Sequence, residues 1–245
     1  LWLGAVSSDW FDPGNWSCGE VPDNSGSIFS VTIRASAPND PEISSTGARV
    51  RDIEIESGAS LNIINDVTLN VYGNWYNHGN FAGDNSAVIF RADDAQVAGS
   101  SFTSFDALQI AGSQLTAVSD SIDVQGDFIA DGTLVPNDGI ISFTGDATQE
   151  ISGTATSLVF YDLVVDKPSQ TLQLNRHVDV SNYLTLVEGV VETSASSLLR
   201  IMDGAGADPG NADAFVDGPL QKTGNQPFTF PTGNSGVWAP VEITA

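Results

Sequence analysis

The sequence contains one cysteine, Cys18, two histidines, His78 and His177, and only eight lysine and arginine residues. A single cysteine excludes an intramolecular disulfide framework, and no Cys/His cluster has zinc-ligand spacing. Neither histidine has an identifiable partner for acid–base or metal chemistry, so we expect structural or surface roles for both. Motifs for serine nucleophiles, phosphate-binding loops and dinucleotide sites are also absent.

Positive charge and long apolar runs are scarce. The 31 acidic residues give a formal net charge of -23. A field of that sign repels phosphate backbones and anionic lipids, so we expect no nucleic-acid partner. We expect no membrane insertion and no signal peptide within the chain, since it lacks an apolar run of about 18 residues and a basic start. The acids are interpreted as a soluble surface in saline surroundings, with specific metal ligation as the alternative.

The residues that are abundant favour short strands joined by turns. Hydrophobic residues make up 41% of the 245 residues, and the chain has 24 Gly and 11 Pro among many Asn, Asp, Ser and Thr residues. The first residue is Leu1, and the last residues, Ile243 to Ala245, have the character of a strand. We therefore expect a mature or excised piece of a longer precursor.

An internal repeat of about 53 residues predicts the architecture. The second copy repeats Gly79, Phe90 and Gln96 of the first as Gly132, Phe143 and Gln149, and a third copy follows; the copies span residues 50–104, 105–157 and 158–205. A unit of this length cannot bury its apolar face alone, so neighbouring copies must stack. The fold class predicted is all-β, a parallel β-helix (solenoid) of roughly ten coils. Tandem β-sandwich domains are the alternative, although each normally needs about 100 residues.

The two ends depart from the repeat. Residues 1–44 contain Trp2, Trp10 and Trp16, a density that predicts a cap over the first open coil. Residues 45–205 are assigned to the solenoid. Residues 206–245 are interpreted as a linker and the start of a following β element.

Three motifs resemble parts of large secreted surface proteins of Bacteroidetes. Residues 2–22 are similar to the tryptophan-rich start of those proteins, residues 73–81 to their recurring GNWxNxGxF unit, and residues 228–240 to their FPxG segment. The resemblance implies export by the type IX route and a place in adhesin-like or gliding-associated proteins. It implies an extracellular location, with any signal peptide removed or outside this chain.

Acidic residues are the first candidates for chemistry, because solenoids can carry paired carboxylates that act on glycans. Asp93 and Asp94 form the only adjacent acidic pair. Asp93 recurs as Asp146 in the next copy, and a residue repeated with the fold is more typical of a turn than of a catalyst. We predict no catalytic residue.

Calcium is the ligand that the residue types favour, although no cofactor is required, because Ca²⁺ binds Asp, Asn and carbonyl oxygens. The candidate ligands lie in the cap and in a glycine-rich stretch near the far end: Asp9, Asp12, Asn15, Asp203, Asp208, Asn211 and Asp213. The alternative for both groups is an ordinary turn rich in Asx residues.

Two surface residues are further candidates. Tyr76 is a glycan-stacking candidate, whereas its neighbour Trp75 aligns with Phe128 and Leu184 and is predicted to face the core. Ser121 lies in Asp120-Ser121-Ile122, which resembles a short O-glycosylation motif of Bacteroidetes.

These observations favour a non-enzymatic extracellular structural or adhesive module of a cell-surface protein, with assembly into a filament as one arrangement of its copies. Its expected partners are other copies of itself, neighbouring domains of a surface protein and, less directly, glycans. The alternative is a polysaccharide-binding or polysaccharide-degrading lyase or hydrolase of the β-helix type. That alternative predicts a long acidic cleft in which carboxylates and a basic residue converge.

Overall fold

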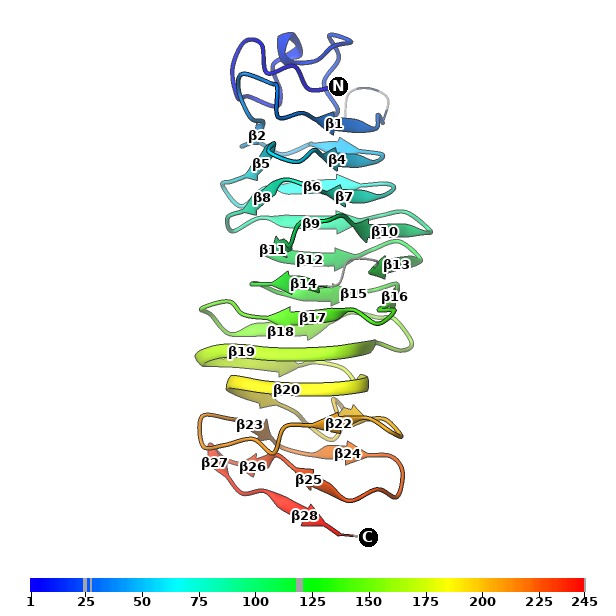
Figure 1. Cartoon of the computed structure of the whole chain (residues 1–245), viewed down its shortest axis with the longest axis vertical. Coiled ribbons are helices and arrows are strands. Elements are labelled where there is room, and N and C mark those ends of the chain that lie inside the picture. Colours follow the sequence, from blue (N-terminus) through cyan, green and yellow to red (C-terminus); the bar gives the residue numbers. More distant parts are fainter. Residues whose placement is uncertain (24–25, 27, 118–120, 245) are drawn as a thin grey trace.

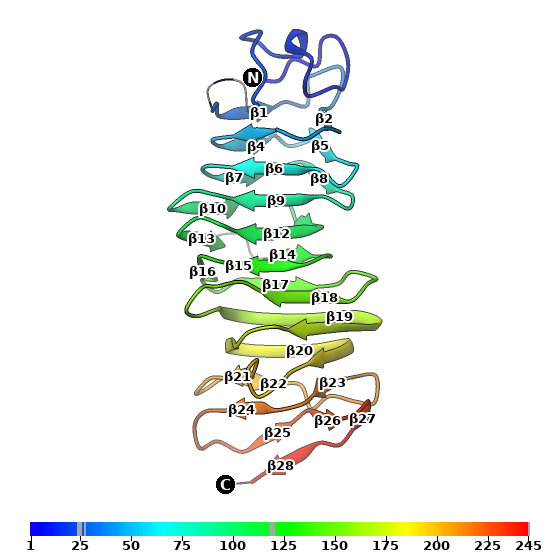
Figure 2. The ribbon, with the colours of Figure 1, turned by 180° about the vertical axis from the view of Figure 1, so that it is seen from behind.

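The computed structural model describes residues 1–23, 26, 28–117 and 121–244. They form an all-β solenoid of about ten turns, with parallel strands stacked along one long axis and the two termini at opposite ends (Figures 1 and 2). The prediction of a parallel β-helix is confirmed. Within the described residues, no helix is both long enough and apolar enough to cross a membrane.

Each coil contains three strand positions, which we call faces A, B and C in chain order. In the first six coils, face A holds β1 (Val31–Ile33), β4 (Ile53–Ile55), β7 (Trp75–Asn77), β10 (Ala95–Ala98), β13 (Gln114–Ala117) and β16 (Thr133–Val135). Face B holds β2 (Glu42–Ile43), β5 (Ser60–Ile63), β8 (Asn80–Gly83), β11 (Thr103–Phe105), β14 (Ser121–Val124) and β17 (Ile140–Phe143). Face C holds β3 (Arg49–Val50), β6 (Thr68–Val71), β9 (Ala87–Phe90), β12 (Ala107–Ile110), β15 (Phe128–Ala130) and β18 (Gln149–Ser152).

The later coils continue the same path. Two long strands, β19 (Val159–Leu174) and β20 (Val178–Glu192), each bend through all three faces. The last two coils contain β21 (Leu199–Ile201), β22 (Gly206–Ala207), β23 (Ala214–Asp217), β24 (Leu220–Lys222), β25 (Phe228–Phe230) and β26 (Thr232–Asn234). Two antiparallel strands, β27 (Val237–Trp238) and β28 (Val241–Ile243), then pair with β26 and β25.

Strand register gives the length of a coil. On face A, Val31 pairs with Ile53 and Ile53 pairs with Trp75, and on face C Leu108 pairs with Phe128. The chain therefore advances by about 20 residues per coil. Because side chains alternate along a strand, every second residue points into a continuous apolar interior.

The 53-residue repeat is longer than two coils and shorter than three. Its equivalent residues lie eight strands apart, so Trp75 lies on face A, Phe128 on face C and Leu184 on face B. All three side chains are fully buried, which confirms that this position faces the core. Equivalent residues of successive copies therefore lie on different faces. The repeat keeps the inward-facing positions apolar, but its length is not the length of a coil.

The solenoid extends beyond residues 45–205 in both directions. Strand β1 already pairs in parallel with β4, and residues 206–234 form coils rather than a linker, since β21 pairs with β24 and β23 with β26. The cause is that the short segments 31–33 and 214–216 place apolar side chains in the core. Strands β27 and β28 pair antiparallel with strands of the last coil.

A tryptophan cluster closes the first coil. The ring of Trp16 contacts those of Trp2 and Trp10 edge to face, at centroid distances of 5.0 and 4.7 Å. A short 3₁₀ helix, η1 (Pro13–Asn15), lies in the same segment. The cap also forms backbone hydrogen bonds with the three strands of the first coil. Trp2 N donates to Thr32 O of β1, Trp10 N donates to Glu42 O of β2, and Arg49 N of β3 donates to Pro22 O. The first coil is therefore covered on faces A, B and C, which protects it from edge-to-edge pairing.

A buried polar network joins three coils at the corner between faces B and C. Lys167 and Gln149 are both fully buried. The Lys167 Nζ donates to Gly145 O at 2.8 Å, Ala147 O at 2.7 Å and Gln149 Oε1 at 2.5 Å, and the Gln149 Nε2 donates to Val124 O at 2.9 Å and Gly126 O at 2.5 Å. Burial lowers the pKa of Lys167 to about 8, although nearby carboxylates oppose the shift.

Candidate functional site

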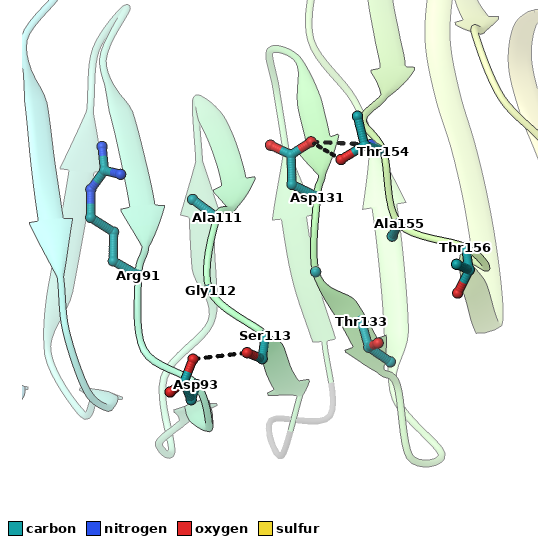
Figure 3. Close-up of a pocket in the computed structure, with 11 residues that line it drawn as sticks. Arg91, Asp93, Ala111, Gly112, Ser113, Asp131, Thr133, Thr154, Ala155 and Thr156 are labelled. Carbon is teal, nitrogen blue, oxygen red and sulfur yellow. Dashed lines mark hydrogen bonds between the residues drawn. The ribbon is translucent and has the colours of Figure 1, made fainter.

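A polar groove of about 470 Å³ lies at the corner between faces C and A (Figure 3). It runs across the turns that follow β9, β12, β15 and β18, so each of four successive coils contributes a short segment. The lining residues are Arg91, Asp93, Ala111, Gly112, Ser113, Asp131, Gly132, Thr133, Thr154, Ala155 and Thr156. The lining is rich in hydroxyl, carboxylate and guanidinium groups and contains no aromatic ring.

Two glycines allow the coils to approach closely beneath this groove. A Cβ atom on Gly112 would lie 1.7 Å from Ala92 O, and one on Gly132 would lie 2.0 Å from Gly112 O. Both contacts are with backbone of the preceding coil, so no other residue type fits without movement of the chain. The corner between faces C and A is therefore closely stacked at these two positions.

Both carboxylates of the groove hold neighbouring coils. Ser113 Oγ donates to Asp93 Oδ1 at 2.8 Å, one coil away. Asp131 Oδ1 accepts from the backbone N and Oγ1 of Thr154 at 3.1 and 2.9 Å, and Asp131 Oδ2 accepts from Gln109 Nε2 at 3.0 Å. Figure 3 shows that the hydrogen bonds of each pair join two neighbouring turns.

The hydrogen bonds of the groove affect the acidity of Asp131. Hydrogen bonds from the side chains of Gln109 and Thr154 lower the pKa of Asp131. A carboxyl group that protonates a glycosidic oxygen needs a raised pKa, so Asp131 is a poor general acid. Arg91 is the cation of the lining, and its Nε donates to Asn70 Oδ1.

The three calcium candidates of the cap lie in one segment, and their side-chain oxygens accept hydrogen bonds from backbone N–H groups of local turns. Asn15 is fully buried, and its Oδ1 accepts from the backbone N of Val6 and Ser7 at 2.8 and 3.1 Å. Asp9 Oδ1 accepts from Phe11 N, and Asp12 Oδ1 accepts from Gly14 N, where Asp12 caps η1. These contacts are those of an Asx-rich turn.

The second group of calcium candidates is distributed over the ninth coil. Asp208 accepts from Tyr183 Oη at 3.1 Å and from Leu186 N at 3.0 Å, and Asn211 Oδ1 accepts from Asp213 N at 2.8 Å. Asp203 lies in the turn after β21. In the described part of the chain, no three His, Cys, Asp or Glu side chains are grouped to hold a metal ion. Calcium binding stays a prediction.

The two surface candidates lie outside the groove. Tyr76 is half-exposed on β7, where it pairs with Glu54 and Ala98 on face A. Ser121 is half-buried at the start of β14, and Asp120 of the glycosylation motif lies outside the described residues.

Sequence reasoning considered Asp93 but did not identify Arg91, Ser113, Thr133 or Thr154 as neighbours. No single spacing would have found the last three. Ser113 follows Asp93 by 20 residues and lies one coil further on, but Thr133 pairs with Gln114, 19 residues before it, and Thr154 bonds Asp131, 23 residues before it.

A family model matches the first part of the chain. The family model described as Domain of unknown function (DUF8693) matches residues 1–110. That range contains the tryptophan cap and the first four coils, and it ends with the last residue of β12. No curated protein and no solved structure matches the chain.

Proposed function

We propose that this chain is a non-enzymatic structural and adhesive module of an extracellular surface protein. The observation that carries the proposal is that polar side chains of the groove hold adjacent coils together. Asp93 and Asp131, the carboxylates best placed for chemistry, accept hydrogen bonds from Ser113 and Thr154 of neighbouring coils. A solenoid whose coils are joined by such hydrogen bonds holds the domains at its two ends at a fixed distance from each other.

Surface charge supports an exposed, saline location. A net charge of -23 favours solubility and is tolerated where salt screens repulsion between the acids. Export by the type IX route and a Bacteroidetes source rest on the resemblance of the sequence motifs.

Contacts with neighbouring domains or with other copies are supported by the last coil. Exposed apolar side chains gather there, on strands β27 and β28: Val237, Trp238, Val241 and Ile243. Apolar groups exposed together are typical of a surface that another protein element covers. End-to-end assembly into a filament is one arrangement that would cover them.

A pair of spin labels tests the rigid spacer. The native Cys18 is exposed in the cap, and Ser235→Cys adds an exposed thiol between β26 and β27. Electron–electron distance measurements are expected to give one narrow distance on the order of 50 Å, since each coil adds about 4.8 Å. A matched pair, Cys18 with Ser196→Cys two coils earlier, should give a shorter distance of equal width. A broad distribution for either pair would contradict a rigid spacer.

Polysaccharide binding is a second candidate function, and the groove is the observation that favours it. The groove is lined mostly by polar residues and spans four coils. Polysaccharide degradation is less favoured, because Asp93 and Asp131 accept hydrogen bonds from side chains of neighbouring coils.

A further inference from the structure

A second hollow, of about 390 Å³, lies between faces A and B of the last three coils. Its lining comes from Tyr183 of β20, from residues 204–207 and Pro209 of the ninth coil, and from Lys222 and residues 226–229 of the tenth. Sites for small ligands usually measure roughly 300–1,000 Å³. The hollow is therefore large enough to hold one unit of a sugar chain.

Tyr183 presents an exposed aromatic ring that the fold holds in place. The residue pairs with Gly206 of the next coil and is 39% exposed. A Cβ atom on Gly206 would lie 2.9 and 3.0 Å from the ring atoms Cε2 and Cδ2, so the edge of the ring lies over the glycine. The Tyr183 Oη donates to Asp208 Oδ1 at 3.1 Å, and Asp208 Oδ2 accepts from Leu186 N. The ring is therefore fixed both at its edge and at its hydroxyl group.

Polar groups accompany the ring in the lining of the hollow. Gln226 is exposed and Thr229 is half-buried, and an amide and a hydroxyl can each donate and accept hydrogen bonds. The Lys222 Nζ donates to Met202 O at 2.7 Å and to Thr223 O at 2.8 Å, which holds the ammonium group in place. A sugar unit combines an apolar face of C–H groups with hydroxyls around its rim. An aromatic ring beside amide, hydroxyl and ammonium groups matches both parts.

A proline-rich peptide fits this hollow less well than a sugar does. Peptides of that kind dock into grooves lined by aromatic side chains. The aromatic residues of the lining are Tyr183 and Phe228, and Phe228 is buried, with its ring packed edge to face on Phe230 at 4.9 Å. One exposed ring is enough for a single sugar unit but does not form an aromatic groove.

We propose that this hollow is a glycan-binding site in which one sugar ring packs against Tyr183 and its hydroxyls bond to Gln226 and Thr229. The proposal deepens the adhesive part of the proposed function and rests on it. Asp208 and Gly206 act as positioning residues, because they hold the tyrosine ring and need not touch the sugar. Binding breaks no bond.

Calorimetric titration of the whole chain tests this inference. The probes are cellohexaose, xylohexaose, maltohexaose and hexagalacturonate, which differ in linkage and charge, together with a proline decamer. We expect saturable binding of at least one hexasaccharide and no binding of the proline decamer. Absence of binding to all four hexasaccharides, or binding of the proline decamer in their place, would overturn the proposal.

Substitutions of the tyrosine locate the site. Tyr183→Ala is expected to weaken binding on the order of tenfold, the effect of losing an aromatic stacking contact. Tyr183→Phe keeps the ring and should bind within about threefold of the wild type. Tyr76→Ala is the matched control, because Tyr76 is a partly exposed tyrosine on face A, four coils or more from the hollow, and should leave binding unchanged. Wild-type binding by Tyr183→Ala would overturn the assignment.

Gly206→Val displaces the ring without removing it. The atoms within 4 Å of a Cβ at this position belong to the Tyr183 side chain, which can move aside, so the fold should be kept, as circular dichroism would show. We expect a loss of binding similar to that of Tyr183→Ala. Wild-type binding by a folded Gly206→Val would contradict the role of the ring position. The spin-label distances are measured without a glycan, so failure of this proposal and failure of the rigid spacer are distinguishable.

Discussion

Replacing Gly112 with alanine is expected to lower the free energy of unfolding by roughly 3 kcal/mol or more. The new Cβ would lie 1.7 Å from Ala92 O, a contact that only a shift of two stacked coils can relieve. Because the neighbouring coils share a packed core, such a shift disturbs side chains on both sides of the corner. Urea unfolding, followed by tryptophan fluorescence, measures the effect.

Gly83→Ala is the matched control for this substitution. The atoms nearest to a Cβ on Gly83 belong to the half-buried ring of Phe81, at 3.1 Å and beyond, and a side chain can move aside. We expect a loss below about 1 kcal/mol. Equal stability of the two variants would show that the corner is not closely stacked.

The free energy of unfolding is expected to rise by up to about 3 kcal/mol between pH 8 and pH 10.5 through Lys167. The pKa of this amine is lowered from 10.5 to about 8 in the folded protein by burial. Between these values the unfolded chain holds a proton that the folded chain lacks, so rising pH favours the folded state. Below pH 8 both states are protonated, and this contribution no longer changes with pH.

Substitution isolates the contribution of Lys167 from those of the other titrating groups. Lys167→Met removes the amine, so the pH slope of stability in this window should fall, whereas Lys222→Met should retain the wild-type slope. Chemical unfolding at half-unit pH steps gives the comparison. An equal slope in the wild type and Lys167→Met would show that the buried amine is not the titrating group.

Much of the fold was predictable from local sequence chemistry. Short strands with alternating apolar residues, bounded by Gly, Asn and Asp, specify half-buried strands and tight corners, and the tryptophans of the first 16 residues specify a cap. The length of a coil was not predictable from the repeat. All three faces bury apolar side chains, so a repeat of eight strands preserves the alternation of buried and outward-facing residues. The alignment of Trp75 with Phe128 therefore does not reveal that the two residues lie on different faces.

The groove could not be identified from the sequence for a related reason. Ser113 and Thr133 become neighbours only because the coils stack, and neither residue is unusual in its own segment. Lys167 lies between Asp166 and Pro168, a setting typical of an exposed turn, yet its amine is buried against the carbonyls of the preceding coil. Both the groove and the burial of Lys167 depend on the stacking of coils far apart in the sequence, which local sequence patterns do not describe.

Turnover of polysaccharides tests the central claim, a non-enzymatic module, most directly. Purified protein is incubated with neutral and acidic polysaccharides, and new reducing ends and unsaturated products are measured. We expect no new reducing ends and no unsaturated products above the level of an unfolded sample. Turnover that is lost in Asp131→Asn, with the fold of that variant intact by circular dichroism, would contradict it and identify the groove as an active site.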